Sequence, residues 1–206
     1  MSALSICKTT PSDTATWQAA MDIYRQAFPE WEREPEDILL ERIHNGRYVM
    51  YCGLENNTVI GFYLLDINPS HHYALFCFLA VSEHCRGRGF GSDLCRDAVA
   101  RFQQNENLDW LLIEAEDRQA IFYGRLGFKK IAMTYNVPKF DAADSVPMHL
   151  MTIATEPNQH AIDKNTLTQL IEHIFVTGYH LPKDDVRIQQ QVAAIPNSAA
   201  LVNWPQ

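Results

Sequence analysis

One stretch of this chain, residues 72–92, constrains its fold more than any other. An almost entirely apolar run at 72–81 leads directly into a short turn that contains three glycines. From residue 89 to residue 104 the apolar side chains then recur every four residues, which is the stripe of a helix packed on a sheet. An uninterrupted apolar run is typical of a central strand buried on both faces. The pattern therefore predicts a strand, a glycine turn and a helix in direct succession.

The glycine turn has the features of a phosphate-binding loop. The first turn of a helix leaves its amides unpaired, and the helix dipole makes that end positive. Glycine lets the backbone approach a phosphate without a Cβ in the way, and Arg86 and Arg88 add charge-assisted donors. The G-x-G-x-G spacing differs from the dinucleotide motif, and Gly91-Ser92-Asp93 is not a nucleotide P-loop. Tight packing at a strand–helix corner is the alternative explanation of these glycines.

The rest of the chain reads as a mixed α/β domain. Pro35 suits the first turn of a helix, and the polar segment Glu55-Asn56-Asn57 between two strand-like runs suits a hairpin turn. Helices are expected at residues 12–28, 35–45, 89–104 and 119–126 and from residue 163 onward, and strands at 48–54, 58–67, 72–81, 108–116, 128–137 and 148–154.

Composition limits the classes of function. The formal net charge of −8 argues against a nucleic-acid partner, because phosphate binding requires a basic surface. The longest apolar stretch, 74–81, is too short to cross a bilayer, which needs about 20 residues, and residues 1–13 hold no apolar run of the length expected for a signal peptide. The five cysteines include no C-x-x-C pair, and no histidine spacing indicates a metal site. We therefore expect a cytoplasmic protein with reduced thiols, no membrane association and no metal.

Two motifs together resemble the GNAT N-acetyltransferase superfamily. Arg86-x-x-Gly89-x-Gly91, with Val81 five residues upstream, resembles the acyl-CoA diphosphate loop of that superfamily. The segment 120–128, AIFYGRLGF, is similar to its Ala-x-x-aromatic-Tyr-x-x-x-Gly-Phe motif. The motifs occur in the family's order, one helix and one strand apart, and the resemblance covers residues 6–154.

Other segments refine this resemblance. Glu114-x-Glu116 and Tyr135-x-x-Pro138 are similar to a bacterial-type branch of the superfamily. One departure concerns the cofactor: many relatives have an Asn shortly before the second motif, where this chain has Glu116-Asp117-Arg118.

The resemblance implies an acetyltransferase domain at residues 1–155 and a helical C-terminal extension at 156–206. Its mixed central sheet would hold antiparallel strands at 48–54, 58–67 and 72–81. The last of these would lie parallel to the strand at 108–116 and splay away from it. Acetyl-CoA would bind as co-substrate, with pantetheine in the gap and the diphosphate on the glycine loop. The residues expected to bind it are Leu79, Ala80, Val81, Arg86, Gly87, Arg88, Gly89, Phe90, Gly91, Ser92, Phe122 and Tyr123.

The implied reaction is direct attack of a primary amine on the thioester in a ternary complex. An amide near Val81 would polarise the carbonyl, and Tyr123 would protonate the leaving thiolate; the alternative is that Tyr123 only packs. A lysine-like amine has a pKa of about 10.4 and needs a base. We expect Glu114 to be that base and Glu116 to orient the ammonium, since carboxylates are uncommon at the end of a buried strand. A solvated strand end is the simpler interpretation of both.

Several alternatives stay open. His71 or His72 could replace Glu114 as the base, and Cys85 beside Arg86 is a minor candidate nucleophile. Glu83 is expected on the surface.

The acceptor would be the amine of a small molecule or peptide, and we expect Glu30 and Trp31 to contact it. They belong to an acidic run with Glu32, Glu34, Glu36 and Asp37 that otherwise reads as a solvated helix start. The C-terminal extension would cover the acceptor cleft or form a homodimer contact. A non-catalytic acyl-CoA-binding module of the same fold is the alternative function.

Overall fold

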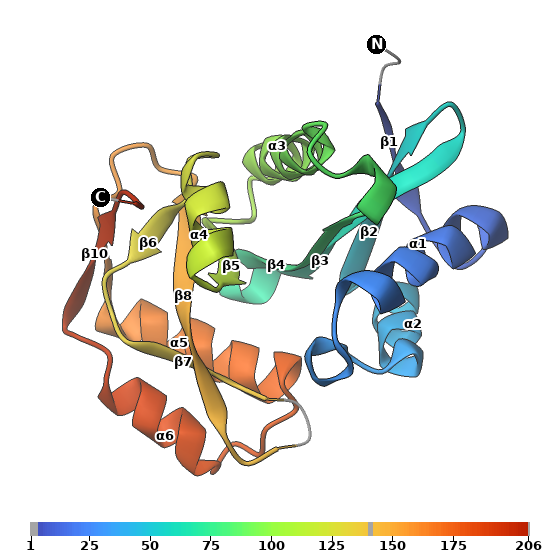
Figure 1. Ribbon diagram of the computed structural model, residues 1–206. Helices are drawn as coiled ribbons and strands as arrows, with labels where there is room; N and C mark the ends of the chain where they lie inside the picture. Colours follow the sequence, from blue (N-terminus) through green and yellow to red (C-terminus); the bar gives the residue numbers. More distant parts are fainter. Residues whose placement is uncertain (1–3, 140–141, 206) are drawn as a thin grey trace. The chain divides into compact units, whose positions relative to one another are not determined.

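The computed structural model describes residues 4–139 and 142–205, without the side chain of Trp31 (Figure 1). These residues form two compact units. The N-terminal unit comprises Met1–Asn68 and Ala74–Glu106, and the C-terminal unit comprises Pro69–Tyr73 and Asn107–Gln206. The chain therefore passes between the units three times. The division at residue 155 expected from the sequence stays a prediction.

The sheet of the N-terminal unit follows the order β1-β2-β3-β4. Its strands are β1 (Ser5–Thr9), β2 (Tyr48–Glu55), β3 (Thr58–Asn68) and β4 (Tyr73–Val81). β2 pairs antiparallel with both β1 and β3. Asn56 and Asn57 join β2 to β3 with φ angles of 50° and 62°, which are the left-handed values that a two-residue type I′ hairpin requires. The hairpin turn predicted from the sequence is confirmed.

Three helices cover this sheet (Figure 1). α1 (Thr14–Ala27) and α2 (Glu36–His44) cover one face, and a short 3-10 turn, η1 (Glu30–Glu32), lies between them in the chain. α3 (Phe90–Gln103) covers the opposite face. The apolar stripe of α1 packs with buried side chains of β2 and β3, including Met50 and Phe62. On the other face, the Tyr63 hydroxyl of β3 donates to Asp97 of α3 at 2.5 Å.

Within the C-terminal unit the strands follow the order β5-β8-β6-β10-β9. Its strands are β5 (Trp110–Ala115), β6 (Lys129–Ile131), β7 (Tyr135–Pro138), β8 (Ser145–Ala154), β9 (Ala161–Asp163) and β10 (Ser198–Val202). β7 pairs with β8 beside this path, and the pairs β5–β8, β6–β8, β7–β8, β6–β10 and β9–β10 are antiparallel. The helices are α4 (Asp117–Gly124), α5 (Lys164–His173), the π-helix η4 (Ile174–Gly178) and α6 (Val186–Ala193).

The predicted fold class, a mixed α/β fold with a largely antiparallel sheet and flanking helices, is confirmed. Three strands were not expected: β1, β9 and β10. The strand predicted at 128–137 is two strands, β6 and β7, separated by a turn. Of the helices that the structure describes, none combines the length and apolar character needed to cross a lipid bilayer.

Candidate active site

The end of β4 leads into the predicted phosphate loop. Ala80 is buried, whereas Leu79 and Val81 on either side are half-buried. The amide of Ser82 donates to the carbonyl of Ile60 at 2.8 Å, which ties the start of the loop to β3. A single 3-10 turn, η3 (Glu83–Cys85), then carries the chain to Arg86. Arg86 is exposed, and its Nε donates back to the Val81 carbonyl at 3.3 Å.

The loop depends on two glycines in left-handed conformations. Gly87 has φ 77° and Gly89 has φ 92°, backbone angles that residues with a Cβ rarely adopt. A Cβ on either residue would meet no atom within 4 Å, so this side of both glycines faces open space. Gly89 is the N-cap of α3, and its carbonyl accepts the amides of Ser92 and Asp93. Helix geometry leaves the amides of Phe90 and Gly91 without a carbonyl within the helix, which suits an anion.

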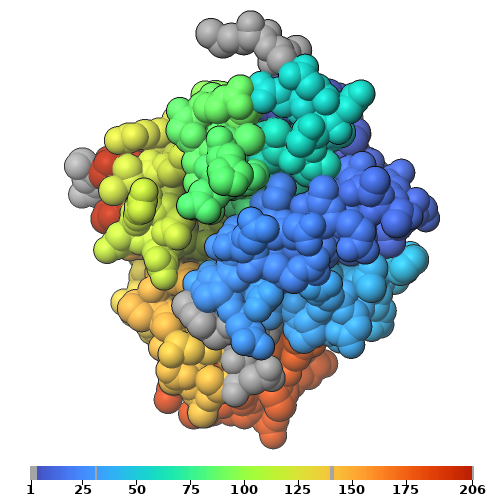
Figure 2. Space-filling view, turned by 45° about the vertical axis from the view of Figure 1, so that its right-hand side comes forward, coloured from blue at the N-terminus to red at the C-terminus, as the bar shows by residue number. Residues whose placement is uncertain are grey.

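The Arg88 side chain is bound by another residue of the same chain. Its guanidinium donates two hydrogen bonds to the Glu55 carboxylate, at 3.0 and 2.7 Å, and lies 4.7 Å from the centre of the Phe90 ring. In Figure 2 the green segment that includes this loop borders the cyan β2–β3 hairpin at the surface. The predicted contact of Arg88 with the cofactor therefore competes with an existing ion pair.

A cavity lies between the loop and α1. Its volume is about 220 Å³, and it is open to solvent. It is lined by Ile23, Gln26, Ala27, Val81, Ser82, Glu83 and Arg86. Glu83 is exposed, as predicted. The last turn of α1 and the end of β4 thus enclose space next to the candidate phosphate loop.

The second predicted motif forms α4 and the turn that follows it. Tyr123 lies in the last turn of this helix and is buried, with 7% of its surface exposed. Its ring contacts those of Phe122 and Phe128, with centroids 5.0 and 5.6 Å away. Gly127 takes a left-handed φ of 98° before β6. This environment is compatible with both interpretations of Tyr123, the acid and the packing residue.

Glu114 makes the most unusual contacts in the C-terminal unit. Its Oε1 accepts the Tyr135 hydroxyl at 2.5 Å, and its Oε2 accepts the Tyr179 hydroxyl at 2.5 Å. Burial raises the pKa of the carboxyl above its usual range, and the two phenolic hydrogen bonds oppose that rise. Glu114 is therefore a half-buried carboxyl group oriented by two hydrogen bonds, and not a solvated strand end. The sequence motif included Tyr135, but nothing local marked Tyr179.

The remaining predicted site residues are scattered. Glu116 is exposed at the N-cap of α4, Glu30 is exposed in η1, and the side chain of Trp31 lies outside the described part of the structure. His71 and His72 are exposed, with the His71 ring stacked on His173 at 3.9 Å. Among the described residues, no group of three or more His, Cys, Asp or Glu side chains is arranged to hold a metal.

The cysteines offer no strong candidate nucleophile. All five are free thiols. Cys85, the last residue of η3, is half-buried. Burial raises the pKa of Cys52 to about 11 and that of Cys95 to about 12, which keeps both thiols protonated.

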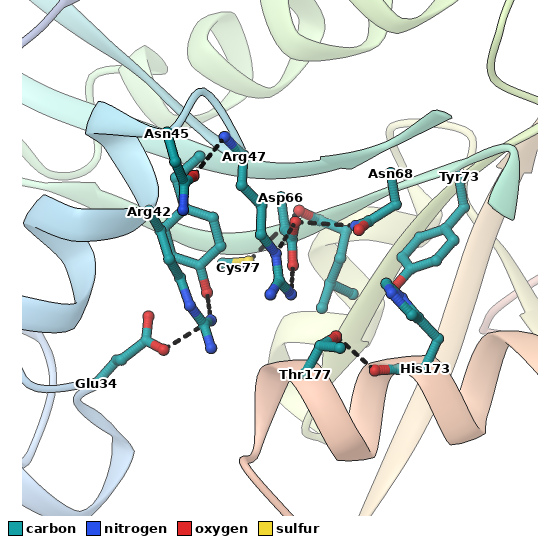
Figure 3. Close-up of polar contacts among 12 residues, drawn as sticks. Glu34, Arg42, Asn45, Arg47, Asp66, Asn68, Tyr73, Cys77, His173 and Thr177 are labelled. Carbon is teal, nitrogen blue, oxygen red and sulfur yellow. Dashed lines mark hydrogen bonds and ion pairs between the residues drawn. The ribbon is translucent and has the colours of Figure 1, made fainter. Parts of the chain in front are cut away.

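The acidic run at 30–37 has two kinds of environment. Glu30, Glu36 and Asp37 are exposed, which agrees with a solvated helix start. For Glu34 that prediction is wrong, because its carboxylate is buried and pairs with Arg42 Nη1 at 2.7 Å. Figure 3 shows this pair beside α2.

A second buried ion pair lies nearby in the same unit (Figure 3). Arg47 donates to both oxygens of Asp66, at 2.9 and 2.5 Å, and Asn68 donates to the same carboxylate at 2.9 Å. Both Arg42 and Arg47 lie over the Tyr48 ring. Since each of these charges is matched within the protein, the network accounts for the burial of Glu34 and Asp66 without a ligand.

Comparisons with known proteins place these features in context. The family model described as "Acetyltransferase (GNAT) family" matches residues 17–128 of the chain. No curated protein sequence matches it.

Solved structures share the fold at low identity. A protein of Bacteroides thetaiotaomicron, described as a candidate acetyltransferase of the GNAT family, is 20% identical over 86% of this chain and 99% of its own, with a TM-score of 0.69. Spermidine N-acetyltransferase from Vibrio cholerae, solved with CoA and spermine, is 19% identical over 74% of this chain and 95% of its own, with a TM-score of 0.58. An aminoglycoside 6'-N-acetyltransferase complexed with coenzyme A is 14% identical over 75% of this chain and 99% of its own, with a TM-score of 0.59.

Proposed function

Because the chain belongs to the GNAT acetyltransferase family, we propose that it transfers the acetyl group of acetyl-CoA to a primary amine. The observation that carries this proposal is the loop before α3. Its two left-handed glycines face open space at the positive end of a helix, where a diphosphate would be stabilised. The residues present therefore fit a coenzyme A diphosphate.

In this proposal the N-terminal unit holds the cofactor. The amides from Gly87 to Gly91 and the guanidinium of Arg86 bind the diphosphate, next to Ser92. Pantetheine pairs with the backbone of Leu79, Ala80 and Val81. An amide near Val81 donates to the thioester oxygen and stabilises the negative charge that develops there. Arg88 contributes mainly by fixing the loop to Glu55, because its donors already have a partner.

The proposed mechanism assigns its two proton transfers to Glu114 and Tyr123. Glu114 accepts a proton from the amine, directly or through water, as the nitrogen attacks the acetyl carbon. The new C–N bond forms and the C–S bond breaks. Tyr123 then donates its proton to the departing sulfur, with Phe122 packed beside its ring. Burial raises the pKa of Glu114, and a carboxylate with a raised pKa is a stronger base than an ordinary glutamate.

For the acceptor we propose a chemical class of amine and not a single compound. Two of the solved relatives are named for spermidine and aminoglycoside acetylation, and both substrates carry several amines. For this chain we propose a cationic small-molecule or peptide amine, oriented by the exposed carboxylates of Glu116 and Glu30 and by Trp31. Free thiols throughout the chain support a reducing, cytoplasmic location.

Two measurements test the proposal. Calorimetry with coenzyme A should detect binding, and a panel of polyamines, amino sugars and peptides should then be screened for acetyl-CoA consumption. Tyr123→Phe should retain coenzyme A affinity and lower turnover at least about tenfold, as expected for loss of a general acid. Tyr51→Phe, in which the changed tyrosine of β2 stacks on Tyr63, serves as the control and should turn over normally. Binding without turnover on any amine would instead support a non-catalytic acyl-CoA-binding module.

A further inference from the structure

We propose that Tyr179 and Tyr135 are positioning residues that hold the Glu114 carboxylate in the orientation of a general base. This inference rests on the proposed acetyl transfer and extends it to a part of the chain outside the family match, which ends at residue 128. It assigns a role in the reaction to the C-terminal extension.

The geometry of the carboxylate supports this role. Each oxygen of Glu114 accepts one phenolic hydroxyl at 2.5 Å, the short distance of a charge-assisted O–H···O⁻ bond. A carboxylate offers about four acceptor sites, so two remain for an amine or a bridging water. Two bonds from different elements, β7 and the segment after η4, fix the plane of the carboxylate more firmly than either bond alone.

An irregular helix brings Tyr179 to this position. After α5 the chain widens into the π-helix η4, and the Tyr179 amide bonds the Ile174 carbonyl at 3.3 Å, five residues back. π-helical turns are rare and often occur at functional sites. His180 then takes a left-handed φ of 56°, and the Leu181 amide closes the turn on the Phe175 carbonyl at 3.1 Å. A regular continuation of α5 would point residue 179 in another direction.

Aromatic packing holds both phenols in place. The fully buried ring of Phe175 contacts both phenols, with ring centroids 5.9 Å from Tyr135 and 5.9 Å from Tyr179. Tyr135 is itself 2% exposed. Burial raises its pKa well above the usual 10.0, so its hydroxyl stays a donor.

Few titratable groups in the described part of the C-terminal unit lie against the Glu114 carboxyl. Within the described part of the C-terminal unit, the titratable groups that contact it are the phenols of Tyr135 and Tyr179. Tyr73 interacts electrostatically with Tyr135, and its own hydroxyl bonds Nδ1 of His173 at 2.7 Å. A change at Tyr73 therefore removes a nearby hydroxyl without removing a bond to Glu114.

Removing the Tyr179 hydroxyl should change the pKa of Glu114 in a predictable direction. Its hydrogen bond favours the ionised carboxylate, so Tyr179→Phe should raise the pKa of Glu114 further. The base acts only when deprotonated, and activity is lost as pH falls through its pKa. The acidic limb of the kcat/KM profile should therefore move to higher pH. We expect kcat at neutral pH to fall about tenfold, which is less than the roughly 10²- to 10⁴-fold contribution of a general base because Glu114 itself is kept, while KM for acetyl-CoA stays constant.

The experiment compares Tyr179→Phe with Tyr73→Phe and adds a readout that does not need turnover. Tyr73→Phe should leave the acidic limb in place. In the Glu114→Gln background, Tyr179→Phe should cause no further loss. Carbon-13 NMR titration of the Glu114 carboxyl should show the same upward shift in Tyr179→Phe, even if the wild type consumes no acetyl-CoA, in which case only the proposed function fails. An active wild type whose acidic limb is unchanged by Tyr179→Phe would overturn the positioning role.

Discussion

At the scale of single residues, the candidate phosphate loop depends on Gly89. Its φ of 92° places an added Cβ in open space, where the diphosphate is proposed to bind. Gly89→Ala should therefore do two things: it should destabilise the fold by about 1–2 kcal/mol through the left-handed backbone, and it should weaken coenzyme A binding by at least about tenfold. Chemical denaturation measures the first effect and calorimetry the second.

Gly46 provides the matched control for this change. It follows α2, has φ 80°, and an added Cβ there also meets nothing within 4 Å. Gly46→Ala should carry a similar backbone penalty with no loss of coenzyme A affinity. If both variants bound coenzyme A as tightly as the wild type, the diphosphate could not lie against Gly89.

Some residues of the candidate site can be identified from the sequence, whereas several of their contacts cannot. The loop glycines, Tyr123 and Glu114 can be singled out because each belongs to a short, continuous motif. The ion pair of Arg88 with Glu55 and the bond of Tyr179 to Glu114 join residues 33 and 65 positions apart. Such contacts depend on how strands and helices are placed, and no local pattern encodes them.

At the scale of elements, Gly61 lets β3 approach the end of β4. A Cβ at this position would lie 2.6 Å from the Ala80 carbonyl oxygen and 3.2 Å from Val81 Cα, so the β4 backbone would have to move. Gly61→Ala should destabilise the protein by about 1–3 kcal/mol, the usual cost of overpacking. Because the displaced backbone is the one proposed to pair with pantetheine, KM for acetyl-CoA should rise more than kcat falls. Steady-state kinetics with a denaturation curve test this.

Its cross-strand partner Gly53 is the control. The nearest atoms to a Cβ there would be side-chain methyl groups, those of Leu94 and Leu4 at 3.1 and 3.2 Å and that of Ile60 at 3.6 Å, which can shift. Gly53→Ala should therefore leave KM unchanged and cost little stability. Equal effects of the two variants would show that the close approach of β3 to β4 is unimportant for the cofactor.

Elements with strong periodicity are predictable from this sequence, and short ones are not. The stripe at 89–104 identifies α3, and the polar Glu55-Asn56-Asn57 segment identifies the β2–β3 turn. β10 was missed because Ser198–Val202 is short and mostly apolar, so the alternation of exposed and buried residues in the structure has no matching polar–apolar alternation in the sequence. Its strand conformation comes from pairing with β6 and β9, which is a tertiary effect.

At the scale of the whole molecule, the C-terminal unit draws on both sides of residue 155. β10 lies between β6 and β9 in its sheet. The buried Gln191 side chain of α6 accepts the Asn136 amide at 2.9 Å and donates to the Thr134 carbonyl at 2.8 Å, which caps backbone groups beside β7. Residues 156–206 therefore complete the sheet that carries Glu114, and their loss would expose strand edges as well as remove Tyr179.

A substitution at Gly124 tests whether the C-terminal tail is needed for the fold, because α4 approaches the backbone of Trp204 at this residue. An added Cβ would overlap the carbonyl oxygen of Trp204 and lie 2.8 Å from its carbonyl carbon, so either α4 or the C-terminal tail must shift. The tail is held in place, with the Trp204 ring 4.9 Å from that of His149 and under the Lys130 ammonium. We expect Gly124→Ala to cost about 1–3 kcal/mol, which lowers Tm by about 2–4 °C per kcal/mol. Gly178→Ala, whose Cβ would make an ordinary 3.8 Å contact with Ile174, should keep the wild-type Tm in the same thermal scan. A wild-type Tm for Gly124→Ala would mean that the tail is dispensable, and the case for residues 156–206 as part of the catalytic fold would then depend on Tyr179 alone.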